Sequence, residues 1–196
     1  LFEVATRPGV RVTSGFYGPA ERYLREVGAD IDFMPADFRR FDPLLEAQRP
    51  RVMATVATPP DADGWLSLSV HAGATTEALH RCGADPDRGL IVEAKPNFPR
   101  TLGLLPEYGH RLHVDEIDIL VEGDRPPLDL ADPEPTAVEQ EIARIAGAYV
   151  QDGCTLQTGI GGIPSAVASL LAERDGGDYG VHSEMFTSGL MRLHRA

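Results

Sequence analysis

Apolar residues recur along this chain with two different spacings, which alternate from one segment to the next. Short apolar runs predict strands at residues 31–35, 51–58, 65–70, 89–95, 154–159 and 179–183. Apolar residues three or four positions apart predict helices at residues 18–29, 36–48, 75–82, 136–150 and 164–174. This alternation is typical of an α/β fold with an open, mostly parallel sheet flanked by helices.

Several details of this pattern can be checked against a structure. Pro43 is expected to break helix 36–48, and the alternation in strand 65–70 predicts that only one of its faces is buried. In helix 136–150, one face is lined by Val138, Ile142, Ile145, Ala146 and Tyr149. Residues 96–111 predict an irregular loop, and the proline-rich residues 123–135 predict an extended connector.

The sharpest local signal is a strand, a glycine loop, a helix and a second strand. The loop reads "GIGGIPS" at residues 159–165, with Pro164 suited to the first helical position, and the second strand runs into Glu184. Because the strands of such a crossover are parallel, the glycine loop and Glu184 should lie at the same sheet edge. Free N–H groups at a helix start can bind an anion or a developing oxyanion. This edge is therefore the predicted site of chemistry.

The same residues are also compatible with purely structural roles. The glycines could serve only close packing of strand against helix, and "GIGGIP" is neither a dinucleotide-binding nor a Walker A motif. Glu184 could cap a helix or form a salt bridge, and His182 could be a satisfied core or edge histidine. Lys95 and Arg100 could be ordinary solvated charges, and Cys154 is predicted to be a small buried hydrophobic residue.

Composition narrows the function classes. The 196 residues carry a net charge of −12, which disfavours nucleic acid as a partner, and no apolar run is long enough to span a membrane. Two distant cysteines argue against a disulfide framework and favour a cytoplasmic protein, and the histidine spacing indicates no metal site. A small anionic ligand would need a local cation, and the chain has a single lysine, Lys95.

Beyond these patterns, "LQTGIGGIPSAVASLL" and "GVHSEMFTSGLMRL" closely resemble the acetyl-CoA hydrolase/transferase family, which includes 4-hydroxybutyrate CoA-transferases. The match continues upstream through "TPPDADGW", "NFPRTLG" and "LHVDEID", from about Phe16 to the end. The resemblance implies a class I CoA-transferase domain of the NagB/RpiA-like fold. It also implies that residues 1–196 are an N-terminal portion, incomplete at both ends, which lacks the C-terminal domain and is inactive alone.

The resemblance assigns roles to particular residues. Glu184 falls on the family's catalytic glutamate, and an ordinary glutamate, with a pKa of about 4.3, is ionised at neutral pH and can attack a thioester. The loop bordering the reacting carbonyl would be formed by Gly159, Gly161 and Gly162. Binding of substrate or CoA would involve Asn97, Arg100 and His182. The family implies an acyl-CoA and a small carboxylic acid as substrates, no permanently bound cofactor, and a homodimer.

Three alternatives remain at this stage. The same glutamate could transfer CoA between acids or, if water intercepts the intermediate, hydrolyse acetyl-CoA. A non-catalytic CoA-binding module on the same fold would bind CoA without exchange. A relative of sugar-phosphate isomerases would require basic residues at the glycine loop, and residues 157–173 contain none.

Overall fold

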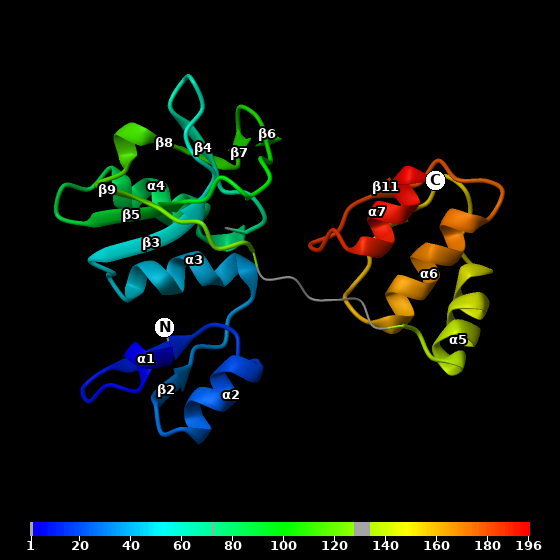
Figure 1. Cartoon of the computed structure of the whole chain (residues 1–196), viewed down its shortest axis with the longest axis horizontal. Helices are drawn as coiled ribbons and strands as arrows, with labels where there is room; N and C mark the ends of the chain where they lie inside the picture. Colours follow the sequence, from blue (N-terminus) through cyan, green and yellow to red (C-terminus); the bar gives the residue numbers. More distant parts are fainter. Residues whose placement is uncertain (1, 72, 128–133) are drawn as a thin grey trace. The chain divides into compact units, whose positions relative to one another are not determined.

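The chain forms two compact units, Leu1–Pro127 and Leu128–Ala196, and each is described by itself (Figure 1). The computed structural model describes residues 2–71, 73–127 and 134–196. The division falls within residues 123–135, the predicted connector, of which residues 128–133 lie outside the described part. That residues 1–196 form one incomplete domain stays a prediction.

The first unit is built around a three-stranded parallel sheet in the order β3-β5-β9. Its strands and helices, in chain order, are α1 (Phe2–Ala5), β1 (Arg11–Ser14), α2 (Pro19–Glu26), β2 (Asp30–Phe33), α3 (Phe38–Ala47), β3 (Val52–Ala57), β4 (Trp65–Ser67), the 3-10 turn η1 (Gly73–Thr75), α4 (Thr76–Gly83), β5 (Gly89–Ala94), β6 (Gly103–Leu104), β7 (Tyr108–Gly109), β8 (Arg111–His113), the 3-10 turn η2 (Val114–Glu116) and β9 (Ile119–Glu122). β1 pairs with β2 in parallel, whereas β4–β8 and β6–β7 are antiparallel pairs.

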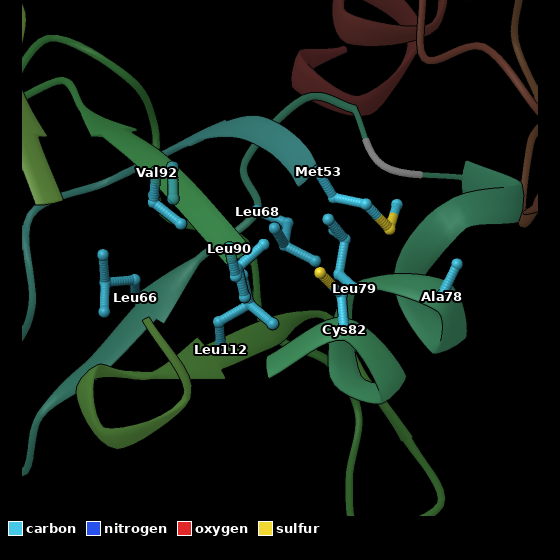
Figure 2. Packing of buried hydrophobic residues seen from close by; sticks show 10 residues of the cluster. Met53, Leu66, Leu68, Ala78, Leu79, Cys82, Leu90, Val92 and Leu112 are labelled. Carbon is cyan, nitrogen blue, oxygen red and sulfur yellow. The ribbon is translucent and has the colours of Figure 1, made fainter. Parts of the chain in front are cut away.

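A leucine-rich core lies against this sheet. Figure 2 shows Leu79 and Cys82 projecting from α4 toward the buried leucines of the strands. Leu66, Leu90 and Leu112, which come from β4, β5 and β8, are fully buried. The core thus joins the parallel sheet to the antiparallel β4–β8 pair through side chains that lie far apart in sequence.

Pro43 does not break its helix, because α3 runs without interruption from Phe38 to Ala47. Proline removes one backbone hydrogen bond from a helix interior, but the residues around it are anchored independently. Asp42 forms an ion pair with Arg81, and Glu46 forms one with Arg88 at 3.1 Å. These contacts hold both sides of the proline to the rest of the unit.

Strand 65–70 is also buried on the face that was expected to be solvated. Ser67 and Ser69 are 1% and 3% exposed. The Ser67 hydroxyl donates to the carbonyl of Thr101, and the Ser69 hydroxyl donates to that of Pro99, both at 2.7 Å. The segment predicted as a loop therefore covers the serines, and farther along it contains the β6–β7 hairpin.

Residues 134–196 of the second unit form three helices and one short parallel strand pair. Its elements are α5 (Ala137–Gly147), β10 (Thr155–Leu156), α6 (Gly162–Glu173), β11 (Gly180–Val181) and α7 (Ser188–Arg195). α6 packs against both α5 and α7 (Figure 1). It begins at Gly162, so that Pro164 is its third residue rather than its first.

Small residues make the helix contacts of this unit. α5 buries Ala143 and Gly147, whereas the predicted apolar face around Ile142 and Tyr149 is largely exposed. α6 buries a stripe formed by Gly162, Ser165, Ala168 and Leu171. Glycine and alanine let helix backbones approach closely, and their low hydrophobicity hides this face from a hydropathy pattern.

The fold class expected from the sequence is confirmed, since parallel strands flanked by helices recur in both units. In the part that the structure describes, however, the strands form several small sheets rather than one continuous sheet. No helix among these residues is both long and apolar enough to cross a lipid bilayer.

Candidate functional site

The glycine loop and the segment before Glu184 leave the same edge of one strand pair. β10 and β11 are parallel, with Thr155 opposite Gly180 and Leu156 opposite Val181. The N–H of His182 donates to the carbonyl of Leu156 at 3.0 Å, which extends the pairing by one step. The two segments that follow β10 and β11 therefore continue side by side beyond the carboxyl ends of these strands.

Ser183 joins these two continuing segments. Its hydroxyl accepts a hydrogen bond from the N–H of Thr158 at 3.3 Å and donates to the carbonyl of Thr158 at 3.1 Å. We call this pair of hydrogen bonds the Ser183 clamp. Glu184 directly follows Ser183, and Gly159 directly follows Thr158. Ser183 was not among the residues predicted to matter, although its place between a histidine and the candidate glutamate was a usable signal. The hydroxyl of Thr158 is buried and has no partner among the described residues.

The three glycine positions of the loop differ in how strongly the structure requires glycine. Gly161, which precedes α6, has φ of +131°, a backbone conformation that side chains rarely adopt. A Cβ at Gly162 would collide with the carboxylate of Glu139, so any side chain there would have to displace Glu139. Gly159 has no positive φ, and a Cβ there would meet nothing within 4 Å. Packing explains Gly162, but it leaves open space beside Gly159.

Glu139 places a carboxylate directly behind the start of α6. It belongs to the capping box of α5, where it accepts hydrogen bonds from the N–H and the hydroxyl of Thr136, both at 2.8 Å. These two bonds, the backbone one first, hold the pKa of Glu139 below its ordinary value of 4.5. The capping box was predictable from sequence spacing, whereas its contact with Gly162 was not.

The candidate nucleophile is open to a ligand. Glu184 and His182 are both exposed in the second unit, and β11 ends before either residue. Two hollows of about 410 and 490 Å³ lie in this unit, and neither is lined by Glu184, Gly159, Gly161 or Gly162; Ser165 lines the first, and Val181 and Phe186 line the second. The structure thus brings Glu184 and the glycine loop to one strand edge without enclosing Glu184 or the three glycines in either hollow.

The other two candidate binding residues belong to the first unit. The side-chain amide of Asn97 donates to the carbonyl of Asp124 at 2.9 Å. Arg100 donates to the carboxylate of Asp61 and to the carbonyls of Pro59 and Trp65, at 3.0, 2.9 and 3.1 Å. Arg100 is therefore not an ordinary solvated charge, because it ties its loop to the turn after β3.

Asp61 is the acidic partner of Arg100 in this set of contacts. Hydrogen bonds from the backbone N–H groups of Trp65, the larger contribution, and Asp63 lower its pKa, and the positive charge of Arg100 lowers it further. The turn is thus held from both sides while its carboxylate stays ionised. This arrangement gives Arg100 a structural role, whatever it contributes to ligand binding.

Two further expectations about single residues are wrong. Lys95 is only 8% exposed; it directly follows the central strand β5, and its ammonium lies beside the ring of Phe98. Cys154 is half-buried rather than buried, since it lies just before β10 at the border of a two-stranded sheet. Among residues 2–71, 73–127 and 134–196, no cluster of three or more histidine, cysteine or acidic side chains is placed to hold a metal ion.

Comparison with known proteins places these features in a family. No family model matches the chain. The succinyl-CoA:cyclohexane-1-carboxylate CoA transferase of Geobacter metallireducens is 31% identical over 193 residues, which are 98% of this chain and 41% of that protein. The 4-hydroxybutyrate coenzyme A transferase of Clostridium kluyveri is 35% identical over 84% of this chain and 36% of its own length. The chain thus spans about two fifths of the length of these relatives.

Solved structures agree with this assignment. RipA from Yersinia pestis is 26% identical with a TM-score of 0.84, over 99% of this chain and 44% of that one. The 4-hydroxybutyrate CoA-transferase of Porphyromonas gingivalis is 27% identical with a TM-score of 0.67, over 92% and 43% of the two chains. Together with the motifs around the glycine loop and Glu184, these relationships show that the chain belongs to the acetyl-CoA hydrolase/transferase family, as a portion related to CoA-transferases.

Proposed function

We propose that this chain is part of an acyl-CoA:carboxylate CoA-transferase in which Glu184 is the nucleophile. The observation that carries the proposal is the Ser183 clamp, which sets Glu184 next to a glycine loop with open space at Gly159. An exposed carboxylate beside free backbone N–H groups has the arrangement that acyl transfer requires. The CoA-transferase names of the relatives support the same chemistry.

In the first half-reaction, a carboxylate oxygen of Glu184 attacks the carbonyl carbon of the acyl-CoA. The carbon–sulfur bond breaks, CoA leaves as a thiolate, and an acyl-glutamyl anhydride forms. The thiolate then attacks the glutamyl carbonyl of the anhydride and releases the first acid as its carboxylate. The product is a glutamyl-CoA thioester. A carboxylate can begin this sequence without a general base, because it is already deprotonated at neutral pH.

The second half-reaction reverses these steps with a different acid. The incoming carboxylate attacks the glutamyl thioester, CoA thiolate leaves, and a new anhydride forms between the acid and Glu184. Attack of the thiolate on the acyl carbonyl gives the new acyl-CoA and restores the Glu184 carboxylate. If water attacks the thioester instead, the outcome is hydrolysis, so the same residue accounts for both activities of the family.

The glycine loop would stabilise the negative oxygen that develops at each attack. α6 begins at Gly162, and the first N–H groups of a helix lack partners within the helix. Gly159 and Gly161 would let the substrate approach the backbone closely, since neither carries a side chain. His182 would lie beside the same edge. We expect substrate binding to involve Asn97 and Arg100 as well. The complete enzyme would also include a C-terminal domain and a second copy of the chain.

The experiment is an exchange assay on the full-length protein that contains this sequence. A panel of acyl-CoAs and carboxylic acids is supplied in pairs, and both free thiol and new acyl-CoA are measured. The protein is compared with Glu184→Gln, and CoA binding is measured by calorimetry for both. We expect new acyl-CoA from the parent protein, a loss of at least about a thousandfold in the variant, and retained CoA binding.

The outcomes separate the candidate functions. New acyl-CoA without free thiol supports transfer, whereas free thiol without new acyl-CoA identifies a hydrolase using the same glutamate. Saturable CoA binding without either product would contradict the proposal and identify a binding module. Full exchange in Glu184→Gln, after exclusion of deamidation back to glutamate by mass spectrometry, would also contradict it.

A further inference from the structure

We propose that Lys95 binds an anionic oxygen of a substrate, either a carboxylate of the acid or a phosphate of CoA. The proposal rests on the proposed function and concerns a residue that neither the motifs nor the comparisons assign. Lys95 directly follows β5, the central strand of the parallel sheet β3-β5-β9. The carboxyl edge of such a sheet is where ligands of open α/β folds bind.

The position of Lys95 is unusual for a lysine. It is 8% exposed, its N–H donates to the carbonyl of Ala57 at 2.8 Å, and its ammonium lies 5.4 Å from the ring centre of Phe98. Lysines are almost never buried unless their charge is compensated, because removing an ammonium group from water is costly. A chain with a single lysine has therefore placed it where its charge needs a partner.

The protein itself only partly compensates the charge of Lys95, through the carboxylate of Glu93. Nζ of Lys95 lies 3.5 Å from Oε1 of Glu93, whose side chain is 43% exposed. That distance is longer than a charge-assisted hydrogen bond, and an ammonium group has three donors. Among residues 2–71, 73–127 and 134–196, Nζ makes no hydrogen bond to the protein. A donor of Lys95 thus remains for an external anion.

The surrounding cations are less suited to this task. Arg100 is occupied by Asp61 and by two backbone carbonyls. Arg125, which comes after β9, is exposed and sits in solvent, where its charge is screened. In a protein with a net charge of −12, an anionic substrate is repelled overall and needs a local cation in low dielectric. Lys95 meets this need at the carboxyl edge.

Neutral and matched variants test the proposal. Lys95→Met removes the charge while keeping an unbranched stem beside Phe98, and Lys95→Arg keeps the charge. Glu93→Gln is the matched control, because it removes the other half of the ion pair and leaves Lys95 intact. For each full-length protein, the dissociation constants of CoA, dephospho-CoA and acetate are measured by calorimetry, and thermal midpoints are recorded.

We expect Lys95→Met to weaken one ligand by about tenfold or more, the value of a lost charge-assisted hydrogen bond, while Lys95→Arg loses less. Weakened acetate binding identifies the carboxylate. Weakened CoA binding identifies a phosphate, and it is the 3′-phosphate if dephospho-CoA is unaffected. Glu93→Gln should bind the same ligand at least as tightly as the parent protein, since a competing carboxylate is gone.

Two results would overturn the proposal. Unchanged affinity for all three ligands in folded Lys95→Met excludes a binding role, and equal weakening by Lys95→Met and Glu93→Gln identifies a purely structural ion pair. If Lys95→Met does not fold, the comparison of Lys95→Arg with Glu93→Gln decides in the same way. Because these measurements are equilibrium binding, they stand apart from exchange activity, whose absence would contradict the proposed function but not this site.

Discussion

The two units of the chain use different means to hold their elements together. The first unit buries leucines from β4, β5, β8 and α4 in one core, with Leu66, Leu90 and Leu112 fully buried. The second unit joins its helices through small residues such as Ala143, Ala168 and Gly189. Large side chains bury more apolar area per residue, so the first unit gains more from the hydrophobic effect.

This difference separates stability from chemistry. The unit with the larger core is expected to unfold with the greater loss of buried area, whereas the candidate nucleophile follows β11, which pairs with β10 over only two residues. The geometry around Glu184 depends on a few hydrogen bonds from side chain to backbone. Substitutions should therefore reduce stability most in the first unit and reduce activity most in the second.

The largest expected stability effect is that of Leu90→Ala in β5. Leu90 is fully buried in the leucine core, so the substitution leaves a cavity in addition to losing apolar burial. We expect a loss of about 3–5 kcal/mol in the free energy of unfolding. Urea unfolding followed by amide hydrogen exchange in β3 and β5 measures it, and a loss below about 1 kcal/mol would show that this core does not hold the unit together.

A smaller loss is expected from Gly189→Val in α7. A Cβ at Gly189 would lie 2.9 Å from Cβ of Ala168 and 3.4 Å from Cα of Ser165, so a side chain must push α7 away from α6. We expect a loss of about 1–3 kcal/mol, measured by urea unfolding. The control is Gly159→Ala, where space is open, with an expected change within about 0.5 kcal/mol. Equal effects would contradict the close packing of α6 and α7.

Unlike the two substitutions above, Ser183→Ala should reduce activity strongly and stability only slightly. It removes two hydrogen bonds to Thr158, and the free energy of unfolding should fall by about 1 kcal/mol. Exchange by the full-length protein should fall by roughly 10- to 100-fold in kcat, because Glu184 is no longer held beside the glycine loop. Ser188→Ala, at the exposed start of α7, is the control with unchanged kcat. Unchanged kcat in Ser183→Ala would show that the clamp does not position Glu184.

The smallest effect is a pH dependence at the start of α5. The pKa of Glu139 is lowered by its hydrogen bonds to Thr136, so these bonds stabilise the folded state above the ordinary value of 4.5. Their contribution is lost as the pH falls through the lowered pKa. Thr136→Val should therefore destabilise the chain at pH 7 and progressively less in acid, as followed by urea midpoints. A difference that is constant from neutral to acidic pH would assign the effect to the lost N-cap bond, in which the N–H of Glu139 donates to the Thr136 hydroxyl, rather than to the carboxylate.

The central strands of the first unit could be predicted from the sequence, because β3 and β5 are mostly apolar, whereas β1, which reads RVTS, was not predicted. β3 and β5 fall within the predicted ranges and pair in register over six residues. The burial of Ser67 and Lys95 could not be predicted. It depends on contacts with residues 96–101: Phe98 lies beside Lys95, and the carbonyl of Thr101 accepts a hydrogen bond from Ser67. No local pattern encodes these contacts.

In the second unit, the sequence predicted the order of elements better than their packing. The capping box of α5 follows from residue types at fixed spacing, whereas α6 begins at Gly162, two residues before the start predicted at Pro164. The apolar stripe around Ile142 indicated the wrong contact face, because the actual contacts use Ala143 and Gly147. The clamp between Ser183 and Thr158 depends on the register of two short strands, and a sequence pattern does not fix that register.

The most direct test of the central claim is covalent capture of Glu184. The full-length protein is mixed with an acyl-CoA and treated with borohydride, which reduces a glutamyl thioester to an alcohol, or with hydroxylamine, which converts it to a hydroxamate. Peptide mass spectrometry then locates the modified residue. We predict modification of Glu184 that requires acyl-CoA and is absent from Glu184→Gln. Continued exchange with Glu184 unmodified, or modification of another carboxylate, would contradict the account.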